Sequence, residues 1–549
     1  MPSLKLSGCL GRVSCLVLTI LSLAGLCATV PGAASAQALS TLINFNNTNG
    51  QSPYGALFAD ASGNLFGTTL AGGATGAGTA FEVAKNTSGY ASTPTTLVNF
   101  VSFMNGEEPL GGLIADANGN LFGTTFAGGA FDDGTVFEIV KTSSGYSSTP
   151  TVLVNFNGAN GSFPHASLIA DANGDLFGTT SEGGVSGAGT VFEIVKTSSG
   201  YSSTPITLVN FNGANGANPY GSLLADTDGN FIGTTLNGGA FGDGTVYEIV
   251  KTTSGYAGTP TTLVSFNVSN GANPYAGVIA DANGNLFGTT FDAGAFGAGT
   301  VFEIVKTTSG YASTPTTLLN FNVANGQGPQ SALTADVNGD LFGTTEFGGV
   351  SGDGTVFEIV KTTSGYASTP TILVSFNGTN GEGPRGSLIA DASGNLFGTT
   401  EFGGTLGDGT VFEITGSGFV PFIPFASFQA NLAISTMQPY GYALGAAFTT
   451  SAANTAINLA TQAVTLQIAN YTVIFPAKSF QTIGTANVYQ GTINGVTIFA
   501  DLMPLGGNRY AFAAIGLPEN LSATTNPVTV KLTIGANAGS SQVNAVRVP

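Results

Sequence analysis

The sequence predicts an all-β protein, with a seven-bladed β-propeller followed by a small C-terminal β-sandwich. First, a stretch such as "DANGNLFGTT", residues 116–125, returns at a fixed period and is each time followed by a "GTVFEI"-like run. Second, each copy divides into four short β-prone runs separated by turn residues. Third, 81 Gly and 39 Phe supply turn residues and core side chains, while only 8% of residues are charged.

Residues 1–36 have the pattern of an export signal. Lys5 and Arg12 precede an apolar run, and a site of small residues comes directly before Gln37. The apolar run is too short to predict a permanent membrane span. We therefore expect an exported protein that begins near Gln37 and is secreted or held at the cell surface, with the periplasm as the alternative location.

The predicted leader also contains every cysteine, so the mature chain is expected to have no thiol for a disulfide or a metal site. The leader carries two basic residues and no acidic residue, and its removal changes the formal net charge from -18 to -20. Such acidity opposes nucleic acid and anionic membranes as partners, and it favours cations or basic surfaces. The cysteines are Cys9, Cys15 and Cys27.

The repeat is defined by the Asp that opens the motif. Consecutive copies lie 56 residues apart once and 55 residues apart five times. A period of this length is typical of a four-stranded propeller blade. The seven copies therefore predict seven blades over residues 37–415. The aligned residues are Asp60, Asp116, Asp171, Asp226, Asp281, Asp336 and Asp391.

The four runs of one copy are, in the second repeat, "GGLIAD", "NLFGTT", "GTVFEIVK" and "TVLVNF". The first two are joined by a tight turn at Asn118 and Gly119, residue types that accept the positive φ of short hairpin loops. The runs are almost continuously apolar, which predicts sheets that are covered on both faces.

Ring closure is expected to use the N-terminal strand. The "LVNF"-type run occurs between copies and once more at the start, as "TLINF" at residues 41–45, so this segment is predicted to complete the last blade. The competing segment, residues 419–428, contains Pro421 and Pro424, which lack the amide donors that a central strand needs.

The recurrent pattern "P…G.L.AD..GNLFGTT..GG..G.GTVFEI" resembles the choice-of-anchor tandem repeat GloVer-containing proteins. Its "GLIAD..GNLFGTT" part is similar to NHL-type propeller repeats. The resemblance covers roughly residues 41–414. It implies an exported, repeat-built protein, and it supplies no catalytic residues.

The period stops after Ile414. Residues 416–428 are interpreted as a linker, and residues 429–549 as a small β-sandwich, because runs such as "VTLQIANYTVIF" and "PVTVKLTIG" alternate between apolar and polar residues. Asn494 and Gly495 are expected to form a two-residue hairpin turn.

Two acidic residues recur in every copy and are interpreted as structural. The motif Asp faintly resembles the start of a calcium loop, but the ligand order and the distant Glu of such a loop are missing, so a turn cap is favoured. The Glu of the "FE" pair is expected to bond a neighbouring strand or the repeated Lys. We therefore predict no cofactor and no metal site, with Ca²⁺ kept as an alternative.

Function is expected where the copies differ, because repeated positions serve the scaffold. The loops after "GTT" and after "LVNF" are predicted to open on the same face of the ring, where recognition residues are usually displayed. His165, the single histidine, is interpreted as a surface or turn residue. The candidate ligand-binding residues are Tyr54, Glu182, Tyr220, Tyr275, Asp292, Glu346, Glu382, Arg385 and Glu401, and Glu107, Glu108 and Asp132 are further irregular residues of this face.

Glu346 and Glu401 are the only catalytic candidates. They occupy equivalent positions in adjacent copies, so their carboxyl groups are expected near the mouth of the ring. Two carboxylates roughly 5 to 9.5 Å apart are what glycoside hydrolysis requires. The same pair would suit a hard cation, or it would be a solvated pair whose members repel each other.

These features favour an exported, non-enzymatic binding or adhesion protein. Its loop face is expected to bind polysaccharide or a cell-surface protein, because Tyr rings stack on sugars and carboxylates accept hydrogen bonds from hydroxyl groups. Two alternatives stay open: a structural envelope or matrix component, and a carbohydrate-active hydrolase or lyase that uses the paired carboxylates.

Overall fold

The computed structural model describes residues 37–421 continuously, and after Pro421 it describes mainly the strands. The predicted leader, residues 1–36, lies outside the described residues. Within the described part the protein is nearly all-β, and its helical residues are confined to α2 (Ser102–Asn105). No helix among the described residues is long and apolar enough to cross a membrane.

The first repeat forms a four-stranded sheet in the order β2-β3-β4-β7, with every neighbouring pair antiparallel. Both middle strands are buried along nearly their whole length, as the continuously apolar runs predicted. The strands are β2 (Phe58–Ala59), β3 (Leu65–Thr69), β4 (Thr79–Val83) and β7 (Thr95–Asn99).

The next five repeats form sheets of the same order. Their strands are β8 (Ile114–Ala115), β9 (Leu121–Thr125), β10 (Thr135–Ile139) and β13 (Thr151–Asn155); β14 (Ile169–Ala170), β15 (Leu176–Thr180), β16 (Thr190–Ile194) and β19 (Ile206–Asn210); β20 (Leu224–Ala225), β21 (Phe231–Thr235), β22 (Thr245–Ile249) and β25 (Thr261–Ser265); β26 (Ile279–Ala280), β27 (Leu286–Thr290), β28 (Thr300–Ile304) and β31 (Thr316–Asn320); β32 (Thr334–Ala335), β33 (Leu341–Thr345), β34 (Thr355–Ile359) and β37 (Thr371–Ser375).

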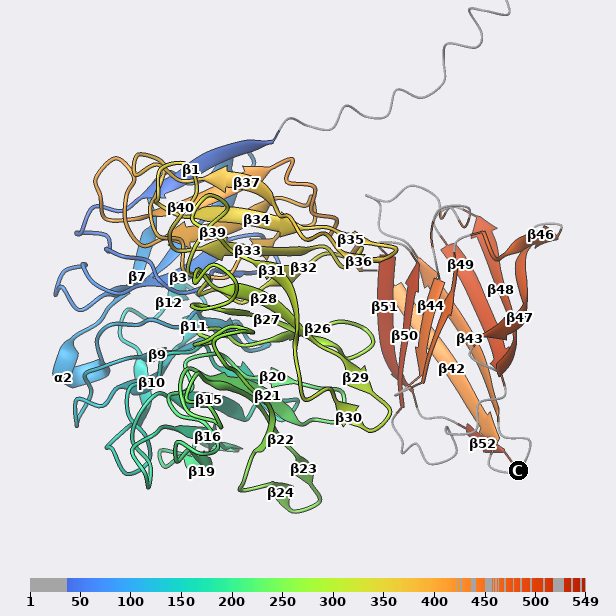
Figure 1. Cartoon of the computed structure of the whole chain (residues 1–549), viewed down its shortest axis with the longest axis horizontal. Coiled ribbons are helices and arrows are strands. Elements are labelled where there is room, and N and C mark those ends of the chain that lie inside the picture. Colours follow the sequence, from blue (N-terminus) through green and yellow to red (C-terminus); the bar gives the residue numbers. More distant parts are fainter. Residues whose placement is uncertain are drawn as a thin grey trace, which may run out of the picture.

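The sheet of the last repeat takes its outermost strand from the N-terminus. It contains β38 (Ile389–Ala390), β39 (Leu396–Thr400), β40 (Thr410–Thr415) and β1 (Ala38–Asn44). β1 pairs antiparallel with β40, from Ala38 opposite Thr415 to Asn44 opposite Thr410 (Figure 1). The competing proline-containing segment does not join this sheet, because β41 (Ile423–Pro424) pairs with a C-terminal strand instead.

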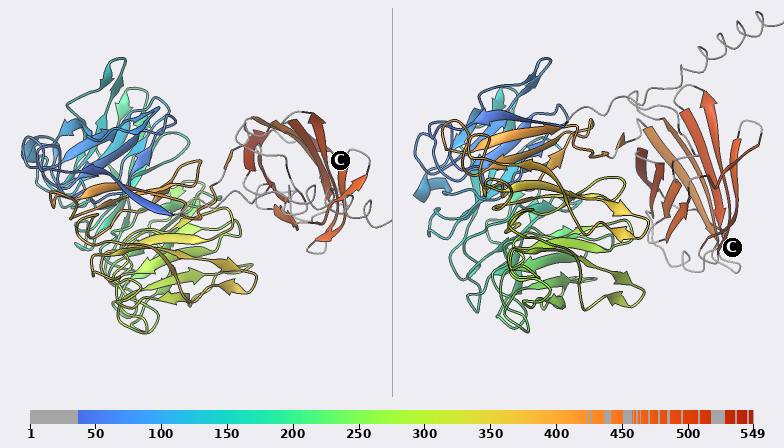
Figure 2. Two further views of the ribbon diagram at one scale, coloured as in Figure 1. Left: turned by 90° about the horizontal axis from the view of Figure 1, so that it is seen from above. Right: turned by 45° about the horizontal axis from the view of Figure 1, so that its top comes forward.

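The sheets of residues 38–415 are arranged around a common centre in a propeller-like manner (Figures 1 and 2). Each neighbouring pair shares an apolar cluster, and one such cluster joins the last repeat to the first, through Phe397 and Val411 against Leu57 and Leu65. The same hydrogen bond joins each of these pairs of neighbours: Thr68 of the first repeat donates to the carbonyl of Gly111 in the second (3.1 Å), and Thr399 of the last repeat donates to that of Gly55 in the first (3.3 Å). The last repeat therefore packs on the first as other neighbours pack on each other.

The Gly of each "LFGTT" strand is required by this packing. A Cβ added to Gly67 would lie 2.6 Å from Cζ of Phe81, the buried aromatic residue of the neighbouring strand. The Phe ring thus fills the space that a side chain would need, and a bulkier residue there would displace the core.

The repeated Asp is a turn residue. Asp60 Oδ1 accepts the backbone N–H groups of Ser62 (2.9 Å) and Asn64 (2.8 Å), and the Asn64 side chain in turn accepts the N–H of Lys85 (2.9 Å). The equivalent Asp residues of the other six repeats accept the same pair of N–H groups. The structural interpretation of this motif is therefore confirmed.

A short hairpin follows the third strand in six repeats. In each hairpin the repeated Lys lies over the ring of the repeated Tyr, with the ammonium nitrogen 5.2–5.7 Å from the ring centroid. Burial raises the pKa of Glu138, and the charge of Lys196 of the next repeat opposes this rise. The ion pair that a repeated Lys forms, Lys85 with Asp391 (3.8 Å), goes to the motif Asp of the neighbouring repeat rather than to the expected Glu. The hairpins are β5 (Lys85–Asn86) with β6 (Gly89–Tyr90), β11 (Lys141–Thr142) with β12 (Gly145–Tyr146), β17 (Lys196–Thr197) with β18 (Gly200–Tyr201), β23 (Lys251–Thr252) with β24 (Gly255–Tyr256), β29 (Lys306–Thr307) with β30 (Gly310–Tyr311) and β35 (Lys361–Thr362) with β36 (Gly365–Tyr366).

The last repeat has no such hairpin, and the beginning of the predicted linker packs in its place. The ring of Phe419 lies 5.1 Å from that of Phe342, and the N–H of Val420 donates to Asp336 Oδ2 (3.2 Å). Residues 417–421 thus belong to the repeat region by their contacts.

The C-terminal part contains two sheets that share one apolar core, which includes Leu466 and Leu532 from one sheet and Leu444 and Ile498 from the other. The predicted turn at Asn494 and Gly495 lies outside the described residues, although β47 and β48 pair up to Ile493 opposite Val496. One sheet is β41, β51 (Asn537–Val543), β50 (Val528–Ile534), β44 (Val464–Ile468) and β45 (Tyr471–Phe475); the other is β46 (Gln481–Ile483), β47 (Ala486–Ile493), β48 (Val496–Gly506), β49 (Arg509–Gly516), β43 (Gly441–Thr449), β42 (Ser427–Ser435) and β52 (Val546–Val548).

The closing strand generates a stability prediction. Ile43 of β1 is fully buried in the cluster between the last and first repeats. We expect Ile43→Ala to lower the free energy of unfolding by about 2 to 5 kcal/mol, the usual cost of such a cavity. Urea denaturation followed by circular dichroism measures this change.

The matched control is Ser40→Ala, at an exposed position of the same strand. It is expected to change the free energy of unfolding by less than about 0.5 kcal/mol. Equal unfolding curves for the two variants would show that β1 does not contribute to the closed ring.

Candidate functional site

One position in each repeat brings distant repeats into contact. It directly follows the Pro that precedes the innermost strand, and its side chains are called the axial residues below. Tyr54 of the first repeat lies 5.5 Å from His165 of the third, measured between ring centroids, and its hydroxyl donates to Gln330 of the sixth (2.9 Å). Only side chains near the centre of a ring contact repeats that are not neighbours. The axial residues are Tyr54, Leu110, His165, Tyr220, Tyr275, Gln330 and Arg385.

The backbone holds the axial position in the same way in every repeat. Two residues before it, φ is positive, between 55° and 65°, whether the residue is Asn, Gly, Ser, Glu or Phe. The carbonyl of that residue accepts the N–H of the residue after "GTT", as in Glu346 to Gly328 (3.1 Å) and Glu401 to Gly383 (3.0 Å). The residue after "GTT" is therefore fixed beside the axial residues, and the left-handed conformation is imposed even where the side chain disfavours it.

Aromatic side chains occupy one part of the cluster. His165 contacts Tyr220 (4.5 Å between centroids), Tyr220 contacts Tyr275 (5.3 Å), and Tyr275 contacts Phe291 (5.3 Å). Burial among these rings lowers the pKa of His165 to about 4, and the charge of Arg385 adds to this effect, so the imidazole is neutral at physiological pH. His165 is half-buried and packs between Tyr54 and Tyr220, so its interpretation as a surface or turn residue was wrong, because these contacts join positions far apart in the sequence.

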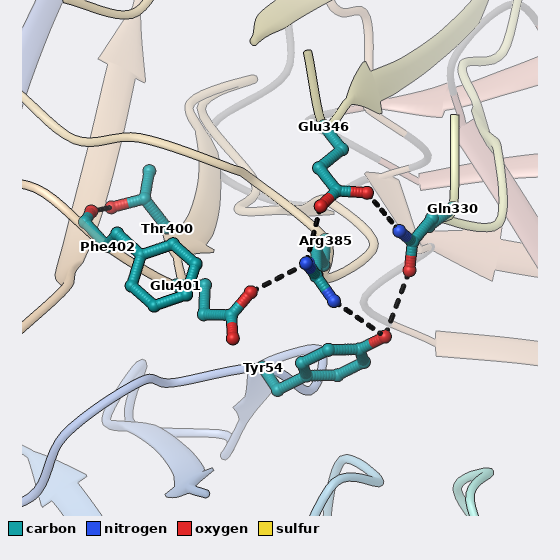
Figure 3. Close-up of polar contacts among 7 residues, drawn as sticks. All are labelled: Tyr54, Gln330, Glu346, Arg385, Thr400, Glu401 and Phe402. Carbon is teal, nitrogen blue, oxygen red and sulfur yellow. Dashed lines mark hydrogen bonds and ion pairs between the residues drawn. The ribbon is translucent and has the colours of Figure 1, made fainter. Parts of the chain in front are cut away.

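A charged network occupies the other part (Figure 3). Arg385 donates through Nη2 to Glu346, and its Nε lies 2.7 Å from Glu401 Oε2 in an ion pair that lacks hydrogen-bond geometry. Its Nη1 donates to the hydroxyl of Tyr54 (3.5 Å), and its Cζ lies 5.1 Å from the centroid of the Tyr54 ring. Gln330 donates to the second oxygen of Glu346. The guanidinium thus contacts protein groups through Nε, Nη1 and Nη2, with two carboxylates for one positive charge.

Both carboxylates are buried. Glu346 is 4% exposed and Glu401 is 6% exposed, so the interpretation as a solvated, repelling pair was wrong. Burial raises the pKa of each carboxyl group, and the charge of Arg385 opposes this rise. Burial also raises the pKa of Tyr54 to about 12, so its hydroxyl stays a hydrogen-bond donor at neutral pH. The cluster therefore presents aromatic rings, while its guanidinium and both carboxylates are buried against one another.

The remaining candidates lie one step outward. Glu182, Asp292 and Glu382 are exposed. Glu182 and Asp292 directly follow the residue after "GTT", and Glu382 directly precedes the residue of positive φ that lies two positions before the axial residue; this positive-φ position is called the clamped turn below. Burial is the main cause of the raised pKa of Tyr220 and of Tyr275, and Glu182 and Asp292 respectively add to it. These three carboxylates therefore act on the cluster through their charge, and not through the hydrogen bonds and ion pairs described above.

The other irregular acids serve their own loops. Ser102 donates to Glu107, Asp132 accepts the N–H of Gly128 (3.2 Å), and Glu108 holds the clamped position with φ 56°. Sequence reasoning missed Gln330, although aligning the residues that follow the repeated Pro would have identified it. Among the described residues, no group of three or more His, Cys, Asp or Glu side chains is placed to hold a metal ion.

The Arg385 network predicts a pH-dependent stability defect. The same repeat position carries Gln330 in the preceding repeat, so Arg385→Gln is compatible with the local backbone. Near pH 7.5 we expect it to lower the free energy of unfolding by about 3 kcal/mol, because removing one partner leaves buried charges uncompensated. Because burial raises the pKa of both carboxyl groups above their ordinary value, the folded state takes up protons at a higher pH than the unfolded state does. The defect should therefore shrink toward pH 4.5, which urea unfolding at both pH values measures.

Arg509→Gln is the control, because Arg509 is exposed in β49. It should cost less than about 0.5 kcal/mol at either pH. A defect in Arg385→Gln that stays constant or grows as the pH falls would contradict the proposed charge compensation.

Comparison with known proteins identifies the repeat. A family model described as the Gloeobacter/Verrucomicrobia repeat matches residues 29–149, 144–258 and 252–457. A search of curated proteins finds no matching sequence.

Solved structures give low similarities. The chain resembles a PL25 ulvan lyase described as bound to -[GlcA(1-4)Rha3S]-, with 12% identity, a TM-score of 0.40, and coverage of 67% of this chain and 94% of that chain. A Trypanosoma rangeli sialidase in complex with the inhibitor DANA gives 11% identity and a TM-score of 0.35, with 92% and 97% coverage. A glucose dehydrogenase gives 14% identity and a TM-score of 0.33, with 68% and 98% coverage. Similarities this low carry no argument about activity.

The family matches extend from residue 29 to residue 457 of the 549-residue chain, in agreement with the resemblance found in the repeated motif. The protein therefore belongs to the Gloeobacter/Verrucomicrobia repeat family.

Proposed function

We propose that the protein is an exported, non-enzymatic binding protein, secreted or held at the cell surface. Its repeat region is a closed seven-bladed propeller, and a β-sandwich follows. The contacts of the last repeat with the first, through β1 and through Thr399, support closure. The core shared by the two C-terminal sheets supports the sandwich.

The observation that carries this proposal is the variety of the axial residues. The preceding Pro and the following Leu-Ala-Asp-like run are nearly the same in all seven repeats, whereas the axial position holds Tyr, Leu, His, Gln or Arg. A position that served only the scaffold would repeat like its neighbours. Seven side chains of five different types, gathered at one place, instead form a specific surface on a rigid support.

The chemistry of this surface favours a neutral saccharide as the ligand. Tyr220 and Tyr275 are partly exposed and supply rings for the apolar faces of sugars. Carboxylate oxygens of the exposed Glu182 and Asp292, near these two rings, accept hydrogen bonds from hydroxyl groups. Because the charge of Arg385 is paired with two carboxylates and the surrounding acids are exposed, an anionic saccharide would meet repulsion without a free cation.

The aromatic part generates the binding test. We expect the double variant Tyr220→Leu, Tyr275→Leu to weaken binding of neutral oligosaccharides about tenfold or more, which corresponds to about 1.4 kcal/mol. Leu is compatible with the site, because Leu110 holds the same repeat position. Isothermal titration with xylan, glucan and chitin oligosaccharides identified from a glycan array measures the affinities.

The control changes hairpin tyrosines of two repeats, Tyr201→Leu with Tyr256→Leu, and should leave the affinity unchanged. Two results would contradict the proposal: the wild-type protein binding no glycan of the array, or the axial and hairpin variants losing affinity equally.

The enzyme alternative conflicts with the charged network. Glycoside hydrolysis needs one carboxyl group free to donate a proton and another free to attack or activate water. Here a single guanidinium lies between the two carboxylates and contacts both. We therefore expect no release of reducing ends or unsaturated products from the glycans that bind. Product release that disappears in Glu346→Gln or Glu401→Gln would favour the hydrolase or lyase alternative instead.

A further inference from the structure

Apolar side chains stand exposed at the tip of the same loop in six repeats. The loop joins the second strand of each sheet to the third, as between β9 and β10. Its exposed apolar residues are between 60% and 92% accessible to solvent, which is rare for large apolar side chains grouped on one surface. These residues, called the apolar crown, are Phe131, Val185, Phe241, Phe296, Val350 and Leu406.

The neighbouring loop at the same end adds to this surface. In the second repeat it forms α2, where Phe103 is 77% and Met104 is 76% exposed. Figure 1 shows α2 and the strand-connecting loops at one end of the repeat sheets, and the hairpins β23–β24, β29–β30 and β35–β36 at the other end. The loops that carry the crown begin at the residue after "GTT", which is hydrogen-bonded beside the axial residues, so the crown and the axial residues share this end.

The fold does not require these apolar side chains. The loop tip is held by its backbone, because the N–H of Val185 donates to Asn210 (2.9 Å) and the N–H of Ala74 donates to Asn99 (2.7 Å) in the first repeat. In that first repeat the tip is Ala74 and Thr75, with no large apolar residue, and the same hydrogen bond forms. The exposed apolar groups are thus available for another molecule.

The charges of the loop end restrict what that molecule is. Carboxylates follow the tips by two or three residues, as at Asp133, Asp243 and Asp353, and further acids surround the axial cluster. Among the described residues of these loops Arg385 is the only Lys or Arg, and it is paired. The six repeated lysines lie in the hairpins. An anionic bilayer or the same face of a second copy would be repelled, whereas a basic surface would be attracted.

We propose that the apolar crown is the docking surface for a protein partner that presents basic side chains around exposed apolar groups. Its apolar tips insert between the partner's apolar groups, and the adjacent carboxylates pair with the partner's cations. This interaction is separate from saccharide binding by the axial residues and does not depend on it.

A defined probe tests the proposal. The probe is a fluorescent amphipathic helical peptide made of Leu and Lys, and the comparison peptide has Glu in place of Lys. The full chain without its leader should bind the Leu–Lys peptide, and added salt should weaken this binding. The Leu–Glu peptide should bind at least tenfold more weakly. Fluorescence anisotropy measures both affinities.

The variant that tests the crown is Phe131→Thr, Phe241→Thr, Phe296→Thr, which copies the Thr of the first repeat onto exposed positions. It should weaken peptide binding at least tenfold. Its control is Val250→Thr, Val305→Thr, Val360→Thr, which removes exposed apolar residues at the hairpin end and should leave binding unchanged. The Tyr220→Leu, Tyr275→Leu variant should also bind the peptide normally.

Several results would overturn the proposal. They are absence of peptide binding by the wild-type chain, equal binding of both peptides, or equal loss in the crown and control variants. Crown-dependent binding to phosphatidylcholine vesicles, or crown-dependent self-association in ultracentrifugation, without preference for the basic peptide would assign the surface to a lipid or to a second copy. If the wild-type chain binds the peptide but no saccharide, only the function proposed for the axial residues is overturned.

Discussion

Every repeat sheet has two apolar faces, and neither is buried by its own repeat. In the first repeat, Phe66 packs against the second repeat while Leu65, its neighbour in β3, packs against the last one. An open row of such sheets would expose one apolar face at each end, at a cost that grows with the area left in water. The contact of the last repeat with the first removes both exposed faces at once, and β1 places Ile43 in the same cluster. Closure is therefore a consequence of how each sheet is built.

The same arrangement produces the site. When sheets surround a common centre, the segments that lead into their innermost strands approach closely, as shown by the 2.4 Å that would separate a Cβ on Gly221 from the backbone nitrogen of Gly277. The backbone in this region is thus restricted to small residues, and variation is left to the axial position. Because the clamped turn before it has a positive φ in every repeat, the axial side chain is delivered to the same place whatever its chemistry. The close packing at the centre thus explains both why the backbone is uniform among the repeats and why variation is confined to the axial side chain.

The sequence predicted the repeat region well because each signal in it recurs. The "LFGTT" and "GTVFEI" runs, the Asp turn and the early strand at residues 41–45 each have a local physical cause, and the structure forms the corresponding strands and turns. It also predicted that Tyr54, Tyr220, Tyr275, Glu346, Arg385 and Glu401 share one end of the ring. It did not predict that Arg385 contacts both Glu residues, nor that His165 is desolvated. Those properties depend on distances between repeats up to 331 residues apart, as for Tyr54 and Arg385, which no local pattern contains.

The charged network lies at the place where the ring closes, and this position links its assembly to closure. Tyr54 comes from the first repeat, Gln330 and Glu346 from the sixth, and Arg385 and Glu401 from the seventh. The hydroxyl of Tyr54 contacts Gln330 and Arg385 only when the first repeat has docked on the last, which is also the contact that buries Ile43. In an open chain Glu346 and Arg385 would keep each other as partners but would lose Tyr54, and the aromatic part would lose the ring that joins it to the charged part. The axial surface is thus complete only when the first repeat packs on the last, and the residues that form this contact are positioning residues for the axial side chains.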